Sequence, residues 1–180
     1  MIYKILFFLA MSVSLCAQNQ LNLSEEEKAW LKAHPVLRVS NELDWAPYDF
    51  NVKGQAQGYS VGYLKLLGER LGVEIKFING YSWKQLLKMS RERKIDIIHP
   101  ISHTLEREDF LHFTPAYLET VNTLAIREDE TEIKLLSDIK GKTLAMVEDY
   151  MTVKPVKSRF PDINFLMVKT SQDGLRAVAA

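Results

Sequence analysis

The chain has 180 residues, of which 47% are hydrophobic and 26% are charged, and it carries 23 basic and 23 acidic residues. This balance is that of an ordinary globular protein, long enough for one domain or two small lobes. Its formal net charge of zero gives no electrostatic reason to expect binding to nucleic acid or to an anionic membrane surface.

The start of the chain has the pattern of a secretory signal peptide. One positive charge, Lys4, precedes an apolar run over residues 5–15, and the small-residue site Leu15-Cys16-Ala17 follows. The run is short for a bilayer span, so an uncleaved anchor is the weaker alternative. A lipoprotein would use Cys16, but Leu15 fits lipid attachment poorly. We expect cleavage after Ala17, export to the periplasm, and a mature chain without cysteine.

Helices and strands are predicted to alternate through the first part of the chain. Ser24 and Glu27 have the spacing of a capping box, and they begin a helix whose apolar face is Leu23, Trp30 and Leu31. Strands are then expected over residues 36–40, 73–78 and 95–99, and helices over residues 60–71 and 83–91.

Breakers and caps support these boundaries. Residues 41–59 are predicted to be loop and turn, because Pro47, Gly54 and Gly58 interrupt them. Gly72 suits the end of one helix, and Ser82 suits the beginning of the next.

A second series of elements follows an extended segment over residues 111–128. The sequence predicts a small helix or turn within residues 135–142, strands over residues 143–147 and 163–168, and helical structure over residues 152–159. Ser171 is the expected cap of the last helix.

The alternation of strands and helices predicts an α/β fold with parallel sheets covered by helices. Two lobes joined by an extended hinge account for the order of elements. The predicted division is a signal peptide (1–17), an N-terminal helix (18–35), a first lobe (36–117), a hinge (118–126) and a partial second lobe (127–180).

Four stretches resemble a known family when they are taken in this order. They are "LSEEEKAWLKAHPVLRVS", "DWAPYDF" with "GQAQGYS", "KIDIIHPISHTLEREDFLHFTPAY", and "LLSDIKGKTLAMVEDY". Together they resemble the family 3 periplasmic solute-binding proteins, and above all the Venus-flytrap sensor domains of BvgS-type histidine kinases. The third stretch is the most specific. The resemblance implies a type II periplasmic-binding-protein-like flytrap, whose two lobes close around a ligand in the cleft between them.

The resemblance also implies further segments beyond the last predicted helix. In the family, these are a strand whose acidic residue holds the ligand's ammonium, a returning hinge strand, and helices that complete the first lobe. We therefore expect a flytrap with a truncated second lobe, in which ligand binding is weak and strand edges are open.

An arginine follows the hydroxyl-rich loop after the third predicted strand. The planar fork of Arg107 suits a carboxylate, and Thr104 is expected to cap the short helix that carries it. Ser102 adds a hydroxyl and a backbone N–H. The resemblance implies that Ser102 and Arg107 bind the ligand's α-carboxylate. The alternative is a surface turn on which Arg107 pairs with Glu106 or Glu108.

Aromatic residues complete the predicted ligand site. The resemblance implies that Tyr48 lines the cleft, with core packing as the alternative, whereas Trp45 is expected in the core or at the lip of the cleft. In the turn of the second lobe, Asp149 stands where glycine is common. Tyr150 has a counterpart in many sensor-type domains, and we include it in the ligand site.

Other polar residues receive structural interpretations. Asp44 and Asp49 flank Pro47 and are expected to be turn residues, although either could face a ligand ammonium. Asp96 is expected to accept backbone hydrogen bonds. His99 and His103 lack the partners of a zinc site, so packed or solvated histidines are expected.

The resulting hypothesis is a periplasmic domain that binds a small carboxylate, amino-acid-like solute. Its partner would be an ABC transporter permease or its own downstream signalling domain. We expect no enzyme, cofactor or metal, because the sequence contains no nucleophile–base pair, phosphate loop or metal motif. The alternatives are an enzyme-associated flytrap domain, either fused to a lytic transglycosylase or similar to cyclohexadienyl dehydratase, and a purely structural exported protein.

Overall fold

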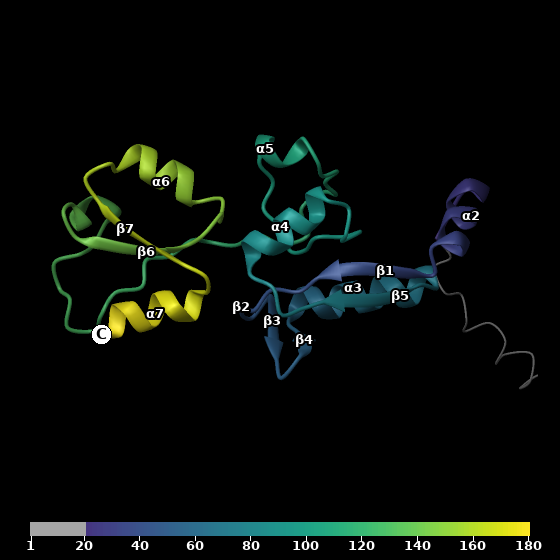
Figure 1. Ribbon diagram of the computed structural model, residues 1–180, viewed down its shortest axis with the longest axis horizontal. Coiled ribbons are helices and arrows are strands. Elements are labelled where there is room, and N and C mark those ends of the chain that lie inside the picture. Colours follow the sequence, from purple (N-terminus) through teal and green to yellow (C-terminus); the bar gives the residue numbers. More distant parts are fainter. Residues whose placement is uncertain (1–20) are drawn as a thin grey trace, which may run out of the picture.

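The computed structural model describes residues 21–180, and the predicted signal peptide lies outside them. The described part forms two α/β lobes that lie side by side (Figure 1). Its elements are α2 (Glu25–Ala33), β1 (Val36–Ser40), β2 (Asp44–Trp45), β3 (Asp49–Val52), β4 (Gln55–Gln57), α3 (Tyr59–Leu71), β5 (Glu74–Ile78), α4 (Trp83–Arg91), α5 (Leu105–Glu108), the 3-10 helix η1 (Leu136–Ile139), β6 (Thr143–Val147), α6 (Val153–Arg159), β7 (Asn164–Val168) and α7 (Ser171–Ala179).

The first lobe is built on the parallel pair β1 and β5. Their register aligns Val36 with Glu74 and Ser40 with Ile78. Helix α3 covers this pair, because Leu64 packs on the buried apolar side chains of the strands. The predicted strands and helices of this lobe are thus confirmed, apart from the third strand.

The third predicted strand, over residues 95–99, is reduced to a single parallel bridge between Val39 and Ile97. The Ser40 side chain accounts for the interruption. Its hydroxyl accepts a hydrogen bond from His99 N at 2.9 Å and donates one to His99 O at 3.1 Å. A side chain therefore takes the place of the next backbone pairing. Asp96 accepts from Arg38 N at 2.7 Å, which confirms its structural role.

The predicted loop over residues 41–59 contains the antiparallel strands β2, β3 and β4, so that prediction was wrong. Lys53 and Gly54 join β3 to β4 with φ angles of 51° and 82°, as in a tight two-residue hairpin. Gly58 has φ of 122°, and a Cβ there would lie 2.3 Å from the Tyr48 carbonyl oxygen. Only glycine lets the chain pass this close to Tyr48.

A second apolar cluster lies beneath α4. It consists of Trp83, Leu86 and Ile95, and Leu86 is fully buried. The capping box of Ser82 and Gln85 fixes the start of α4, as Ser24 and Glu27 do for α2. The predicted apolar face of α2 is only partly used, because Leu31 packs on the first lobe whereas Trp30 is 50% exposed.

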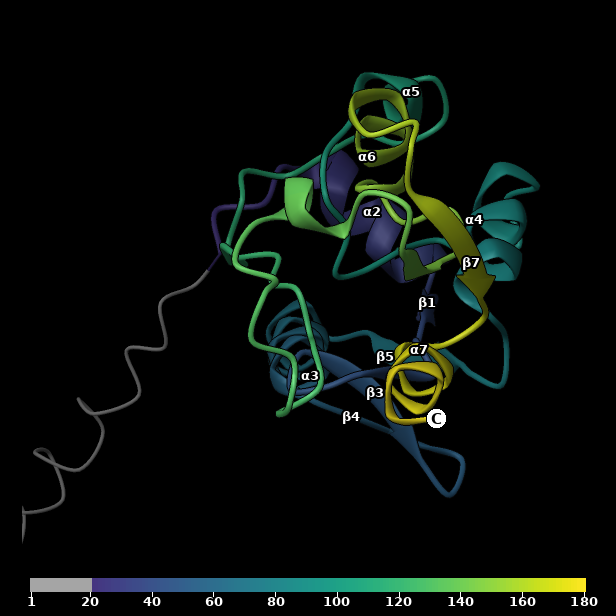
Figure 2. The same ribbon diagram turned by 90° about the vertical axis from the view of Figure 1, so that its left-hand side faces the viewer.

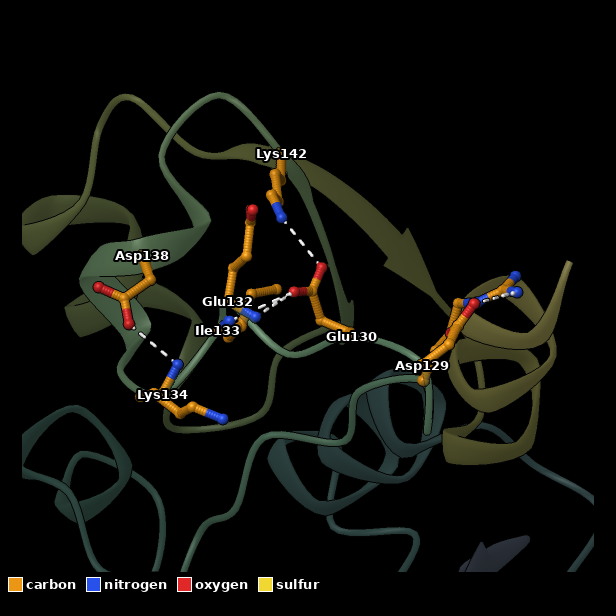
Figure 3. Close-up of polar contacts among 8 residues, drawn as sticks. Asp129, Glu130, Glu132, Ile133, Lys134, Asp138 and Lys142 are labelled. Carbon is orange, nitrogen blue, oxygen red and sulfur yellow. Dashed lines mark hydrogen bonds and ion pairs between the residues drawn. The ribbon is translucent and has the colours of Figure 1, made fainter.

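Residues 111–127 form neither helix nor strand and connect the two lobes. After this connection, the polar contacts of residues 129–142 join neighbouring parts of the same lobe (Figure 3). Glu130 pairs with Lys142 of the segment before β6 at 3.0 Å, and Asp138 accepts from Lys134 N at 2.9 Å. The bounds of the hinge itself stay a prediction.

The second lobe repeats the pattern of the first. Strands β6 and β7 are parallel, with Thr143 opposite Asn164 and Val147 opposite Val168. Helix α7 lies against β6, where Gly174 approaches Ala145. Thr170 rather than Ser171 caps α7, because its side chain accepts from Asp173 N at 3.1 Å.

Candidate ligand site between the lobes

Arg107 lies on the single-turn helix α5 and is only 7% exposed. Its guanidinium donates from Nη1 to Ser102 O at 2.6 Å and from Nη2 to Asp149 O at 3.3 Å. No carboxylate lies within ion-pair distance of Arg107 among residues 21–180. Burial lowers the pKa of the guanidinium. A buried cation that contacts only carbonyl oxygens has capacity for an anion.

The acidic neighbours of Arg107 point elsewhere. Glu106 pairs with Lys154 of α6 and lies 3.9 Å from Arg91, and Glu108 contacts His103 Nε2 at 2.6 Å. The alternative interpretation, a surface turn on which Arg107 pairs with Glu106 or Glu108, is therefore wrong.

Two hydroxyl residues precede Arg107, and neither uses its hydroxyl as expected. Thr104 is the N-cap residue of α5, but its side chain makes no capping hydrogen bond. Its carbonyl oxygen instead accepts from Arg107 N at 3.0 Å. Ser102 contacts the guanidinium through its carbonyl oxygen rather than its hydroxyl. Both residues nevertheless lie in the loop that carries Arg107.

Four aromatic rings lie in contact between the lobes. Tyr150 of the second lobe lies with its ring centroid 6.3 Å from Trp45 and 6.2 Å from Trp83. Trp45 also meets Tyr48 edge-on at 5.6 Å. The structure thus brings Trp45, Tyr48 and Tyr150 together. It adds Trp83, whose ring also lies 5.4 Å from the Arg107 guanidinium.

Glu42 is a buried acid that our sequence reasoning missed. It is 4% exposed, and its Oε2 accepts a hydrogen bond from the Tyr150 hydroxyl at 2.9 Å. Burial raises the pKa of the Glu42 carboxyl to about 8, although the hydrogen bond from Tyr150 opposes this rise. Its signal in the sequence was a charge two residues after the end of a buried strand.

Asp49 and Asp44 make contacts between segments rather than the turns we predicted. Asp49 is fully buried, accepts from Glu42 N at 2.8 Å, and holds Asn41 Nδ2 at 2.5 Å. Burial raises the pKa of Asp49 to about 7. Asp44 accepts from Gln172 N, near the start of α7, at 2.7 Å. Asp49 orients Glu42, and Asp44 joins the first lobe to the second.

The turn after β6 approaches the site through its backbone. Asp149 has φ of 61°, a left-handed conformation that suits glycine, and its side chain is exposed. Its carbonyl oxygen accepts from Arg107 and from Trp83 Nε1, the latter at 3.2 Å. The contact with Arg107 is therefore made by a neutral acceptor and not by the Asp149 carboxylate.

The histidines are packed or solvated, as predicted. His99 is 4% exposed, neither ring nitrogen has a hydrogen-bond partner, and burial lowers its pKa to about 4. Within residues 21–180, no three potential ligands cluster as a metal site would require. No helix in the same part of the chain is long and apolar enough to cross a membrane. A cavity of about 600 Å³ lies apart from the predicted site residues, between residues 125–129 and the end of α7.

Comparisons with known proteins agree with this architecture. Residues 37–179 match the model of bacterial extracellular solute-binding proteins, family 3. The virulence sensor protein BvgS of Bordetella pertussis is 24% identical over 157 residues, which cover 87% of this chain and 13% of BvgS. The probable amino-acid-binding protein YxeM of Bacillus subtilis is 26% identical over 176 residues, which cover 93% of this chain and 61% of YxeM.

The solved periplasmic domain of B. pertussis BvgS has the same fold, with a TM-score of 0.76 at 24% identity. The match covers 87% of this chain and 31% of that one, and it confirms the predicted type II flytrap. The chain spans less than two thirds of the length of both relatives. Because the family model covers most of the chain, the chain belongs to the family 3 bacterial extracellular solute-binding proteins.

Proposed function

We propose that this domain binds a small carboxylate-bearing, amino-acid-like solute in the periplasm, in the cleft between its two lobes. The observation that carries the proposal is Arg107, a buried guanidinium whose hydrogen bonds within residues 21–180 go to carbonyl oxygens. A ligand carboxylate that replaced the Asp149 carbonyl oxygen would form two parallel charge-assisted hydrogen bonds with the Arg107 guanidinium. A relative named as a probable amino-acid-binding protein supports this class of ligand, and a relative named as a sensor supports a role in signalling.

The proposed ligand residues divide by role. Arg107 holds the carboxylate, and the loop residues Ser102 and Thr104 border it. Trp45 and Tyr48 form the aromatic wall against which the rest of the solute packs, and Tyr150 meets this wall from the second lobe. We assign this domain to binding rather than catalysis, for use with an ABC transporter permease or a downstream signalling domain.

Thermal unfolding in the presence of each common amino acid, followed by calorimetry on any that raise the Tm, tests the proposal. Arg107→Ala should raise the Kd at least about 10-fold, since a hydrogen bond to a charged group contributes about 1.5–3 kcal/mol. Arg107→Lys should weaken binding less, because a lysine keeps the charge but loses the planar fork. Arg70→Ala, on the exposed surface of α3, is the matched control. A ligand shift that survives Arg107→Ala unchanged would refute the site.

A further inference from the structure

The turn Glu148–Thr152 of the second lobe occupies the site just described. Asp149 presents its carbonyl oxygen to Arg107 Nη2 and Trp83 Nε1, at 3.3 and 3.2 Å. One residue later, the Tyr150 ring lies near both Trp45 and Trp83, and its hydroxyl donates to Glu42. Two consecutive residues therefore contact the buried cation, the aromatic wall and the buried acid.

These contacts have the chemistry that a bound solute would supply. An oxygen acceptor faces the guanidinium, a flat group lies beside the two tryptophans, and a hydroxyl donor meets the carboxyl of Glu42. Without the turn, Arg107 would lose an acceptor and Glu42 its donor, and both groups are buried. Unpaired buried polar groups are costly, so the turn stabilises the cleft in the absence of ligand.

Contacts on either side of the turn also join the lobes. Asp44 accepts from Gln172 N at the start of α7, and Lys84 of α4 lies 3.4 Å from Glu148. Helices α5 and α6 lie on the same side of the molecule in both views (Figures 1 and 2), where Glu106 pairs with Lys154. The two ion pairs are exposed and contribute little. The part-buried contacts of Asp149 and Tyr150, together with the hydrogen bond from Gln172 N to Asp44, are therefore the main ones that hold the lobes together.

We propose that residues 148–152 act as a built-in substitute for the ligand, which holds the two lobes closed until a solute displaces it. The proposal rests on the proposed function for the identity of the site, but the closed state itself requires no ligand. A solute that displaces the turn must replace its contacts, and this requirement defines the solute class. The solute carries a carboxylate that binds Arg107 and a flat side chain whose N–H or O–H group donates to Glu42.

Closure by the turn lowers the apparent affinity for solute, because only the open fraction can bind. Loss of the Tyr150 hydroxyl alone should raise the open fraction about 2- to 10-fold, the range of one net hydrogen bond. Tyr150→Ala also removes the ring from beside Trp45 and Trp83, so it should open the cleft further than Tyr150→Phe.

A distance measurement between spin labels tests the closed state directly. Cysteines introduced at Glu69 on α3 and at Ser158 on α6 carry the labels at one exposed helical position in each lobe, and the sole native cysteine, Cys16, lies in the predicted signal peptide. Ligand-free protein should give one short distance, and Tyr150→Ala a longer or broader distribution. Tyr150→Phe should lie between them, and the exposed Tyr81→Ala should match the unmodified protein.

Equal distributions in Tyr150→Ala and the parent protein, or a wide parent distribution without ligand, would overturn the proposal. The solute class is tested by adding amino acids with flat donor-bearing side chains and, separately, amino acids without them. If only amino acids without such side chains bind, the proposal that Tyr150 takes the place of the solute side chain is contradicted. If neither group binds, the proposed function fails, whereas the distances still decide whether the turn closes the lobes.

Discussion

Replacing Glu42 by glutamine should flatten the pH dependence of stability between pH 6 and pH 8. The carboxyl is buried, and its pKa is raised from an ordinary 4.5 to about 8, with burial as the largest cause. Glutamine keeps the shape and can still accept the hydrogen bond from Tyr150. The substitution thus removes the titration and leaves the contact.

The sign follows from proton binding. Between the unfolded pKa of 4.5 and the folded pKa of about 8, the folded protein keeps the proton of Glu42 and the unfolded chain has lost it. The free energy of unfolding therefore falls as the pH rises through this window. The slope approaches about 1.36 kcal/mol per pH unit and flattens near pH 8, where the folded protein also releases the proton, so the loss between pH 6 and pH 8 is about 2 kcal/mol. That corresponds to a fall in Tm of about 4–8 °C for a chain of this size.

Asp49 also lowers the free energy of unfolding as the pH rises, and its contribution should remain in the Glu42 variant. Its pKa of about 7 gives it a smaller share, about 1 kcal/mol over the same interval. This share should persist in Glu42→Gln. The parent protein should thus lose about 3 kcal/mol from pH 6 to pH 8, and the variant roughly a third of that.

Urea unfolding followed by tryptophan fluorescence at pH 6, 7 and 8 measures these slopes. Glu69→Gln, at an exposed position of α3, is the matched control and should leave the slope unchanged. Parallel pH profiles for the parent protein and Glu42→Gln would show that Glu42 titrates alike in the folded and unfolded chains. The burial argument would then be refuted.

Three further predictions concern other parts of the first lobe. The pKa of His99 falls to about 4, so its contribution to stability should drop as the pH falls from 6.5 to 4, opposite in sign to those of Glu42 and Asp49; in urea titrations, His99→Leu should therefore gain stability relative to the parent protein over this window. Leu86→Ala should cost about 2–5 kcal/mol in the same assay, whereas Leu105→Ala, at a side chain 79% exposed, should cost almost nothing. Gly58→Ala should lower the Tm by at least about 5 °C, because its Cβ would collide with the Tyr48 carbonyl; an unchanged Tm would contradict the close approach.

The secondary structure was predictable where one local pattern decides it. Capping residues and apolar spacing located α2, α3, α4 and the strand pairs β1–β5 and β6–β7. The third strand failed because a side chain, Ser40, took the hydrogen bonds of His99 that a ladder would have used. The hairpin of β3 and β4 was missed because only the positive φ angles of Lys53 and Gly54 reveal it.

The sequence allows candidate site residues to be chosen where the residue type alone indicates a kind of ligand contact. Trp45 and Tyr150 lie together, and Arg107 contacts Asp149, the residue before Tyr150, while the ligand roles of all three stay a prediction. Glu42 and Trp83 were missed because their role depends on partners far along the chain, 108 and 66 positions away. Contacts at that separation leave no local periodicity.

One contact connects the pH dependence of stability with the state of the cleft. The Glu42 carboxyl keeps its proton because it is buried, and part of what buries it is Tyr150 from the other lobe. The other groups that influence it are Asp49 and Asp44, whose negative charges also favour the protonated form, and Arg107, whose positive charge opposes it. When the lobes part, water reaches Glu42 and its pKa falls toward the ordinary value. If the turn closes the lobes as proposed, opening should therefore favour proton release from Glu42, and the carboxyl becomes available to a solute donor when Tyr150 leaves.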